Sequence, residues 1–173
     1  MQEKRFYRGL YGTNTIEFAK GLIHVHPFGE IGKQYQGQVK LHAHNNFLQI
    51  FLVQDGHTEF HYGTEKITIQ APAFIVVPKN IEHGFLHQTE VSGWIINLAD
   101  TGLEHMLQRE ADVIFGMEEI HIVSISGEEP ATSEVFETMQ KCVDEYNSLF
   151  PGRLLMLQYL VGQMLVQLYR ISL

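Results

Sequence analysis

Residues 37–56 read GQVKLHAHNNFLQIFLVQDG and centre on the apolar run FLQIFLV at 47–53. Successive side chains of a β-strand point to opposite faces, so this run has two faces, Phe47-Gln49-Phe51-Val53 and Leu48-Ile50-Leu52. A strand that is apolar on both faces has to be covered on both. We therefore expect a sheet with a second sheet or a helix packed outside this strand.

Short strand-like runs lie on both sides of this segment. The clearest are GLIHVHPFGE, HTEFHYGTEK, ITIQAP, AFIVVPKN and GWIINLAD, separated by Gly, Asp, Asn and Pro. The run at 57–70 predicts a hairpin with one wet face, since Ile67 and Ile69 alternate with polar residues. Runs of this length and spacing predict a mainly β domain, an antiparallel sandwich or barrel, over about residues 1–125.

Composition limits what this domain can do. The chain has 173 residues and 45% hydrophobic residues, which is typical of one globular domain. Its formal net charge of -8 argues against gripping a phosphate backbone, which needs clustered Lys and Arg. The single cysteine, Cys142, excludes an internal disulfide, and its place in a helical pattern indicates a buried thiol. The N-terminus lacks a secretory signal pattern and no run is long enough for a bilayer, so we expect a cytoplasmic protein that does not engage a membrane.

The period of the apolar residues changes after Asp100. Residues 102–115 predict one or two short helices, and IHIVSI at 120–125 predicts one more edge strand. Pro130 then opens an amphipathic helix, and Pro151-Gly152 separates it from a second helix that begins near Arg153. The sequence therefore predicts a helical hairpin over residues 126–173.

The second helix of this hairpin is apolar nearly all round, so it has to be buried nearly all round. We expect that it forms a homodimer interface, with the alternative that both of its sides pack within one subunit. The predicted interface residues are Leu157, Leu160, Val161, Met164 and Leu168.

Three histidines form the candidate site for chemistry. His42 and His44 are two residues apart, which on a strand puts both side chains on one face, and His83 follows a turn in a distant hairpin. Inside a barrel they could converge with Gln49, and imidazoles set this way are suitable ligands for iron, nickel, zinc or copper. The barrel mouth is also a standard place for a small ligand. Trp94 could stack on that ligand or belong to the core. His24 and His26 share a face, and we expect exposed or structural positions for them, with the alternative that they line the pocket. For His57, His61, His87, His105 and His121 we also expect exposed or structural positions.

The spacing of these residues resembles a known family. Gly37…His42-x-His44-x4-Gln49-x6-Gly56 resembles the first motif of the cupins, and Pro72-x5-Pro78-x-Asn80-x2-His83 resembles the second. The resemblance implies a double-stranded β-helix, also called a jelly-roll barrel, followed here by the helical hairpin. Two departures matter: Gln49 stands where metal-binding cupins usually have Glu, and Pro72 and Asn80 stand at the two glycines of the second motif. The change to Gln removes the one anionic metal ligand.

Over residues 24–173 the sequence also resembles one particular group of cupin-type proteins. HAHNNFLQIFLVQDG, VPKNIEHGF, Gly93-Trp94-Ile95-Ile96-Asn97-Leu98 and the helical pair together are similar to the N-terminal half of AraC-type transcriptional regulators. This implies an effector-sensing and dimerisation domain rather than an enzyme. The effector would contact His42, His44, Gln49, His83 and Trp94. DNA would be read only by a helix-turn-helix domain expected downstream of this chain.

The alternative function is a metal-dependent cupin enzyme, a three-His dioxygenase or an isomerase, with His42, His44 and His83 on a divalent transition metal. No G-x-S-x-G elbow, phosphate-binding glycine loop or dinucleotide fingerprint is present in the sequence. Glu59, Glu65 and Glu82 lie near turns and are expected to face solvent. The sequence therefore assigns no catalytic residues, and the three histidines enter this alternative only as metal ligands.

Overall fold

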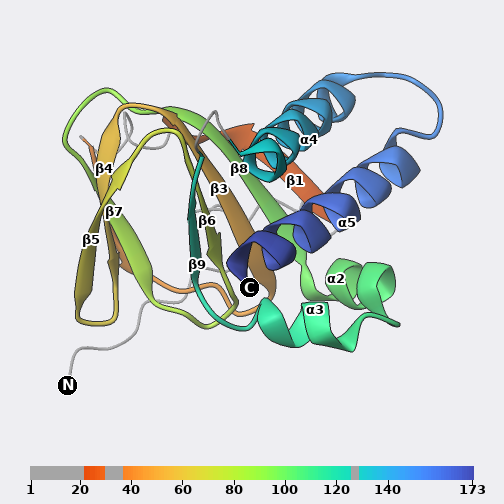
Figure 1. Ribbon diagram of the computed structural model, residues 1–173, viewed down its shortest axis with the longest axis horizontal. Helices are drawn as coiled ribbons and strands as arrows, with labels where there is room; N and C mark the ends of the chain where they lie inside the picture. The colour runs from red at the N-terminus through yellow and green to blue at the C-terminus, as the bar shows by residue number, and fades with distance from the viewer. Residues whose placement is uncertain (1–21, 30–36, 126–128) are drawn as a thin grey trace.

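The computed structural model describes residues 22–29, 37–125 and 129–173. Within these ranges, nine strands form two antiparallel sheets, and four helices follow the eighth strand (Figure 1). This arrangement confirms the predicted fold class, a cupin-type barrel with C-terminal helices. Residues 1–21 and 30–36 of the predicted barrel domain, and residues 126–128 at the start of the predicted helical segment, lie outside the described residues.

The larger sheet has five strands in the order β1-β8-β3-β6-β9. Their bounds are Ile23–Pro27 for β1, Ser92–Ala99 for β8, Phe47–Asp55 for β3, Ala73–Val77 for β6 and His121–Ser124 for β9. The strand predicted from IHIVSI is therefore confirmed as the edge strand β9. β3 lies at the centre, between β8 and β6, so both of its edges are paired.

The smaller sheet has four strands in the order β2-β7-β4-β5. Their bounds are Gln38–His42 for β2, His83–His87 for β7, His57–Tyr62 for β4 and Glu65–Gln70 for β5, and β4 with β5 confirms the predicted hairpin. The register of β2 on β7 shifts between Val39 and His42, so both residues are buried while the two between them are exposed. Gly84 permits this approach, because a Cβ there would lie 2.6 Å from the carbonyl oxygen of Val39.

Aromatic rings fill most of the space between the two sheets. Phe51 on β3 lies 4.9 Å from Phe85 on β7 and 5.4 Å from Phe28, measured between ring centroids. Phe60 on β4 lies 5.1 Å from Phe85. Edge-to-face and tilted pairs at these distances stabilise a core beyond their buried area. This inner core is continuous with the histidines described below.

A second core lies on the outer face of the five-stranded sheet. The helices α2 (Asp100–Leu107), α3 (Ala111–Gly116), α4 (Pro130–Asn147) and α5 (Arg153–Ser172) cover that face (Figure 1). Leu48, Ile50 and Leu52 of β3 belong to this outer core. The prediction that both faces of FLQIFLV are covered is confirmed, by a sheet on one side and helices on the other. Cys142 is buried on α4, as predicted, and burial raises the pKa of its thiol to about 12.

The structure corrects the predicted dimer interface. Leu157, Val161, Met164 and Leu168 are at most 1% exposed within a single subunit, and Leu160 is partly buried. The reason is that α5 packs against α4 on one side and against α2, α3 and β9 on others, so its own subunit covers most of it. Four of the five predicted interface residues therefore cannot contact a second subunit without unpacking this core.

Large apolar side chains do emerge elsewhere on the helical pair. They cluster around the α4–α5 turn and the first turns of α5, and we name them the exposed patch: Leu149, Phe150, Leu154, Leu155, Met156 and Tyr159, each at least 50% exposed. Exposed apolar groups gathered in this way mark interaction surfaces more often than singly scattered ones do. In the described part of the chain, no helix has the length and apolar character needed to cross a membrane.

Candidate functional site

Three histidines converge at one end of the barrel, as the sequence predicted. One ligand nitrogen from each of His42, His44 and His83 lies within 4.8 Å of the others, and all three side chains are buried. We call them the histidine cluster. His42 ends β2 and faces His83 of β7 across the ladder, whereas His44 lies beyond the strand end in the connection to β3. Asn80 holds this connection, since its N–H donates to the carbonyl oxygen of His44 at 2.6 Å.

Asn80 also explains a departure from the family pattern. Its φ of 63° lies in the left-handed region, where the family has glycine. Asn is one of the few other residues that adopt this conformation readily. The turn before His83 therefore keeps its backbone shape without a glycine.

Backbone carbonyls fix the orientation of two of the rings. Nδ1–H of His42 donates to the carbonyl oxygen of Lys40 at 2.8 Å, and Nδ1–H of His83 donates to that of Ile81 at 2.9 Å. A carbonyl can only accept, so Nδ1 carries the proton in both rings and Nε2 presents a lone pair. Such a partner on the far nitrogen is typical of metal-binding histidines.

Burial keeps these two imidazoles neutral. It lowers the pKa of His83 to about 3, with a smaller contribution from the nearby His42, and it lowers the pKa of His42 as well. At neutral pH both rings are therefore acceptors. Nε2 of His83 is buried and has no hydrogen-bond partner within the described ranges.

Gln49 lies on the same inner face of β3 as Phe47 and Phe51. The ring of Phe47 is 4.2 Å from that of His44, and the ring of Phe51 is 6.0 Å from that of His83. Gln49 lies between these two residues and is 1% exposed, so its buried side chain lies on the face of β3 whose phenylalanines pack against the histidine cluster. The predicted convergence of His42, His44, His83 and Gln49 agrees with this placement.

Two further polar residues, Asn97 and His26, extend the site across the sheet. The Nε2 amide of Gln49 donates to Oδ1 of Asn97 on β8 at 2.8 Å, and Nδ2 of Asn97 lies 2.6 Å from Nε2 of His26 on β1. This row of His26, Asn97 and Gln49 was not predicted from the sequence. The available signal was Asn97 itself, a single amide in the otherwise apolar run WIINL.

His24 and His26 were expected to be exposed or structural. The structure places both on the inner face of β1, because Ile23 and Val25 pack into the outer core and strand side chains alternate. The alternative that they line the barrel interior is therefore the better description, and His26 also has the structural role just given.

His26 makes a testable contribution to the pH dependence of stability. Burial, and secondarily the neighbouring His24, lowers the pKa of His26 from 6.5 to about 4. Between these values the unfolded chain binds more protons, so stability is full above pH 6.5 and is lost as pH falls through about 4. The loss attributable to His26 is up to about 3 kcal/mol. Urea unfolding at pH 7.5 and 4.5 should show a smaller pH effect for His26→Gln than for the unaltered chain; equal effects would contradict this contribution.

Trp94 does not belong to the site, which corrects its predicted role as a ligand contact. It pairs with Leu52 in the ladder and packs against the outer core, whereas its neighbours Ile95 and Asn97 face inward. It lines an outer groove of about 730 Å³ together with Gln54, Asp55 and Gln140. Core packing, the alternative for Trp94, describes it better.

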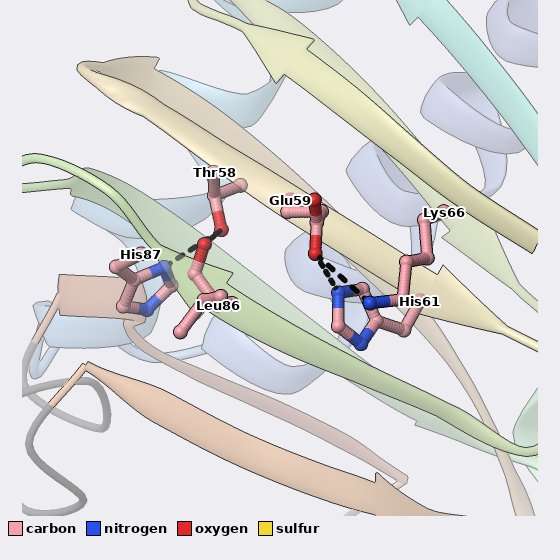
Figure 2. A network of polar contacts seen from close by, with 6 residues as sticks. All are labelled: Thr58, Glu59, His61, Lys66, Leu86 and His87. Carbon is pink, nitrogen blue, oxygen red and sulfur yellow. Dashed lines mark hydrogen bonds and ion pairs between the residues drawn. The ribbon is translucent and has the colours of Figure 1, made fainter.

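Two other histidines of the four-stranded sheet, His87 and His61, belong to two separate polar networks (Figure 2). On the inner face, Thr58 donates to the carbonyl oxygen of Leu86, and its Oγ1 lies 2.9 Å from Nδ1 of His87. On the outer face, His61 and Lys66 both contact the carboxylate of Glu59, whose pKa is lowered mainly by the hydrogen bond from His61. The structural positions expected for His61 and His87 are confirmed.

The residues of the histidine cluster fit a transition-metal ion. Zinc–imidazole bonds are about 2.0–2.1 Å, which in a tetrahedral site puts the nitrogens about 3.3 Å apart. The three nitrogens, which lie within 4.8 Å of one another, would therefore have to move closer together to share one ion. Nε2 of His83 is buried and has no hydrogen-bond partner in the described part of the chain. A bound metal ion would accept its lone pair. His42, His44 and His83 would hold the metal. When bound, it would supply Lewis acidity or redox chemistry according to its identity.

Comparisons with known proteins give relationships of fold. No protein-family model matches the chain, and no curated protein matches it in sequence. Among solved structures, a cupin-2 domain-containing protein from Shewanella frigidimarina is 24% identical, covering 44% of this chain and 68% of its own, with a TM-score of 0.36. KdgF from Halomonas is 21% identical, covering 36% of this chain and 58% of its own, with a TM-score of 0.34.

The likeness extends over the helices in one further case. ToxT from Vibrio cholerae, solved bound to (E)-4-(8-methylnaphthalen-1-yl)but-3-enoic acid, matches 87% of this chain with a TM-score of 0.55 and 6% identity. The matched part spans 57% of ToxT, so this chain corresponds to little more than half of that protein. This likeness shows a shared fold that includes both the barrel and the helical layer.

Proposed function

We propose that this chain is the effector-sensing domain of an AraC-type transcriptional regulator, which binds a small molecule at the histidine cluster and Gln49. The observation that carries the proposal is the position of β3. Its inner face holds Gln49, and its outer face packs Leu48, Ile50 and Leu52 under the helices. A ligand that prefers one arrangement of this sheet thereby biases the helices, to the extent that its affinity differs between the two arrangements.

The chemistry of the site supports binding rather than catalysis. The rings of His42 and His83 are neutral acceptors, and within the described ranges no Asp or Glu is among the buried residues. The site therefore has no buried carboxylate that could serve as an anionic metal ligand or as an acid paired with the histidines. The fold shared with ToxT, which was solved with a small carboxylic acid, also supports the proposal. DNA binding through a downstream helix-turn-helix domain is part of the proposal.

A thermal-shift screen tests it. Small acids, sugars and aromatic compounds would be added to the unaltered chain, to Gln49→Leu and to His61→Ala, whose imidazole lies on the outer face. A true effector at 100 times its Kd should raise the Tm by about 5–10 °C. The shift should be lost in Gln49→Leu and kept in His61→Ala. The same compound should change operator binding by the full-length protein; a screen without such a compound would count against the proposal.

The second candidate is a metal-dependent cupin enzyme, a three-His dioxygenase or an isomerase. The convergence of three imidazole nitrogens within 4.8 Å favours it specifically. Metal analysis should then find about one transition-metal ion per chain, lost in His42→Ala. A chain that can be neither purified with nor loaded with such a metal would exclude this candidate. A loaded metal without turnover of any substrate would favour a sensor that uses the ion to hold its effector.

We also propose that the domain self-associates, through the exposed patch instead of the residues predicted from sequence. The patch is apolar and formed by the α4–α5 turn and the first turns of α5, a single continuous surface that a second copy of the chain could cover in a symmetric contact. Replacing Leu154 and Tyr159 together by Glu should convert a dimer into a monomer in multi-angle light scattering, with unchanged circular dichroism. Lys141→Glu, an exposed change on α4 outside the patch, is the control. A dimer that survives the double replacement would place the interface elsewhere.

A further inference from the structure

A row of three polar side chains crosses the inner face of the five-stranded sheet on neighbouring strands. His26 comes from β1, Asn97 from β8 and Gln49 from β3. The contacts are 2.6 Å between His26 and Asn97 and 2.8 Å between Asn97 and Gln49. Buried polar groups in direct contact polarise and orient one another, so the ends of this row are not independent.

The row has a direction. Nδ2 of Asn97 carries two hydrogens, so it donates to Nε2 of His26, which must be unprotonated. Its Oδ1 then accepts from Nε2 of Gln49, which leaves the carbonyl oxygen of Gln49 as the free end. The low pKa of His26, about 4, keeps its Nε2 an acceptor at neutral pH.

The free end lies on the face of β3 that packs against the histidine cluster. Gln49 lies on β3 between Phe47 and Phe51, whose rings contact His44 and His83 respectively. Oε1 of Gln49 and Nε2 of His83 are both buried without a hydrogen-bond partner among the residues that the structure describes. Two unpaired acceptors enclosed in one apolar core are costly unless something with positive charge or a donor satisfies them.

We propose that His26 and Asn97 are positioning residues, which hold Gln49 so that its carbonyl oxygen serves as a fourth, neutral ligand to a divalent transition-metal ion on the histidine cluster. The inference rests on the metal-binding capacity proposed above. Without the acceptor at position 26, Asn97 can turn its amide over, and Gln49 must then turn its own NH₂ toward the cluster. An NH₂ group that points at a cation weakens its binding. The hydrogen bonds of the row therefore determine whether the amide of Gln49 strengthens or weakens metal binding.

The test uses Co²⁺, followed by calorimetry and by its visible spectrum. His26→Leu removes the acceptor and should weaken Co²⁺ binding by about 10–100-fold, the range for residues that orient a metal ligand. It should also change the spectrum, because the Gln49 oxygen leaves the ion. His26→Gln keeps an acceptor oxygen and should restore both affinity and spectrum. Unfolding of the metal-free proteins measures any loss that is merely structural.

The decisive comparison is the effect of His26→Leu in a chain that also carries Gln49→Glu. A carboxylate offers acceptor oxygens in either orientation, so it needs no positioning. His26→Leu should therefore lose its effect on Co²⁺ affinity when combined with Gln49→Glu. An equal loss in both backgrounds, or no loss in either, would overturn the inference. If Co²⁺ bound to the Gln49→Glu variant but not to the unaltered chain, the inference would be overturned while the histidine cluster remained a metal site. If Co²⁺ bound to neither chain, the metal site itself would be overturned.

Discussion

Replacing His83 by alanine should weaken Co²⁺ or Zn²⁺ binding by at least about 100-fold, the largest effect that we expect from any single change at the site. Residues that only orient a metal ligand contribute about 10–100-fold, and removing one of three imidazoles should exceed that range. His83 is 1% exposed, its Nδ1 is held by the carbonyl oxygen of Ile81, and its Nε2 has no other partner in the described part of the chain. Isothermal calorimetry on the metal-free proteins measures the difference.

His61→Ala is the matched control for this prediction. It also removes an imidazole from the four-stranded sheet, but that imidazole binds Glu59 on the outer face (Figure 2). Its metal affinity should therefore equal that of the unaltered chain. If His61→Ala and His83→Ala weakened binding equally, the ion would be held by surface histidines and not by the cluster.

The sequence predicted the cluster because strand periodicity and motif spacing are local properties. His42, His44 and His83 are positioned by the end of β2 and by the turn at Asn80, and both were visible as short motifs. The two-sided cover of FLQIFLV could be inferred in the same way, since both of its faces are apolar. The bulge between Val39 and His42 could not, because it depends on the close approach allowed by Gly84 on another strand.

The errors have a common physical cause. In GWIINL both faces of the strand are largely apolar, so nothing local tells whether Trp94 or Asn97 faces the barrel; the ladder with β3 decides it. In β1 the histidines alternate with Ile23 and Val25, which could equally have faced inward. α5 is apolar nearly all round, and a pattern cannot distinguish cover by the same subunit from cover by a second one. In each case the missing information is which other element lies on which side.

Leu157→Ala should lower the free energy of unfolding by about 2–5 kcal/mol, the usual range for a buried leucine cut to alanine. Leu157 is 1% exposed and belongs to the outer core. That core also contains Val161 of the same helix, α5, and Met139 of the neighbouring helix, α4. Leu155 lies two residues away on α5, is 54% exposed and belongs to the exposed patch. The same replacement there should change the free energy by no more than about 0.5 kcal/mol in the monomer. Urea unfolding of both variants measures the contrast.

The dependence on protein concentration separates core from interface in this pair. If Leu157 packs within its own subunit, its alanine variant should be less stable by the same amount at every concentration, because the lost contacts are intramolecular. If Leu157 instead contacted a second subunit, the deficit would shrink as the chain was diluted toward the monomer, and the sequence-based interface would be restored. For the alanine variant of Leu155 the opposite dependence is informative, because a stability deficit that grows with concentration would place the exposed patch in the dimer contact.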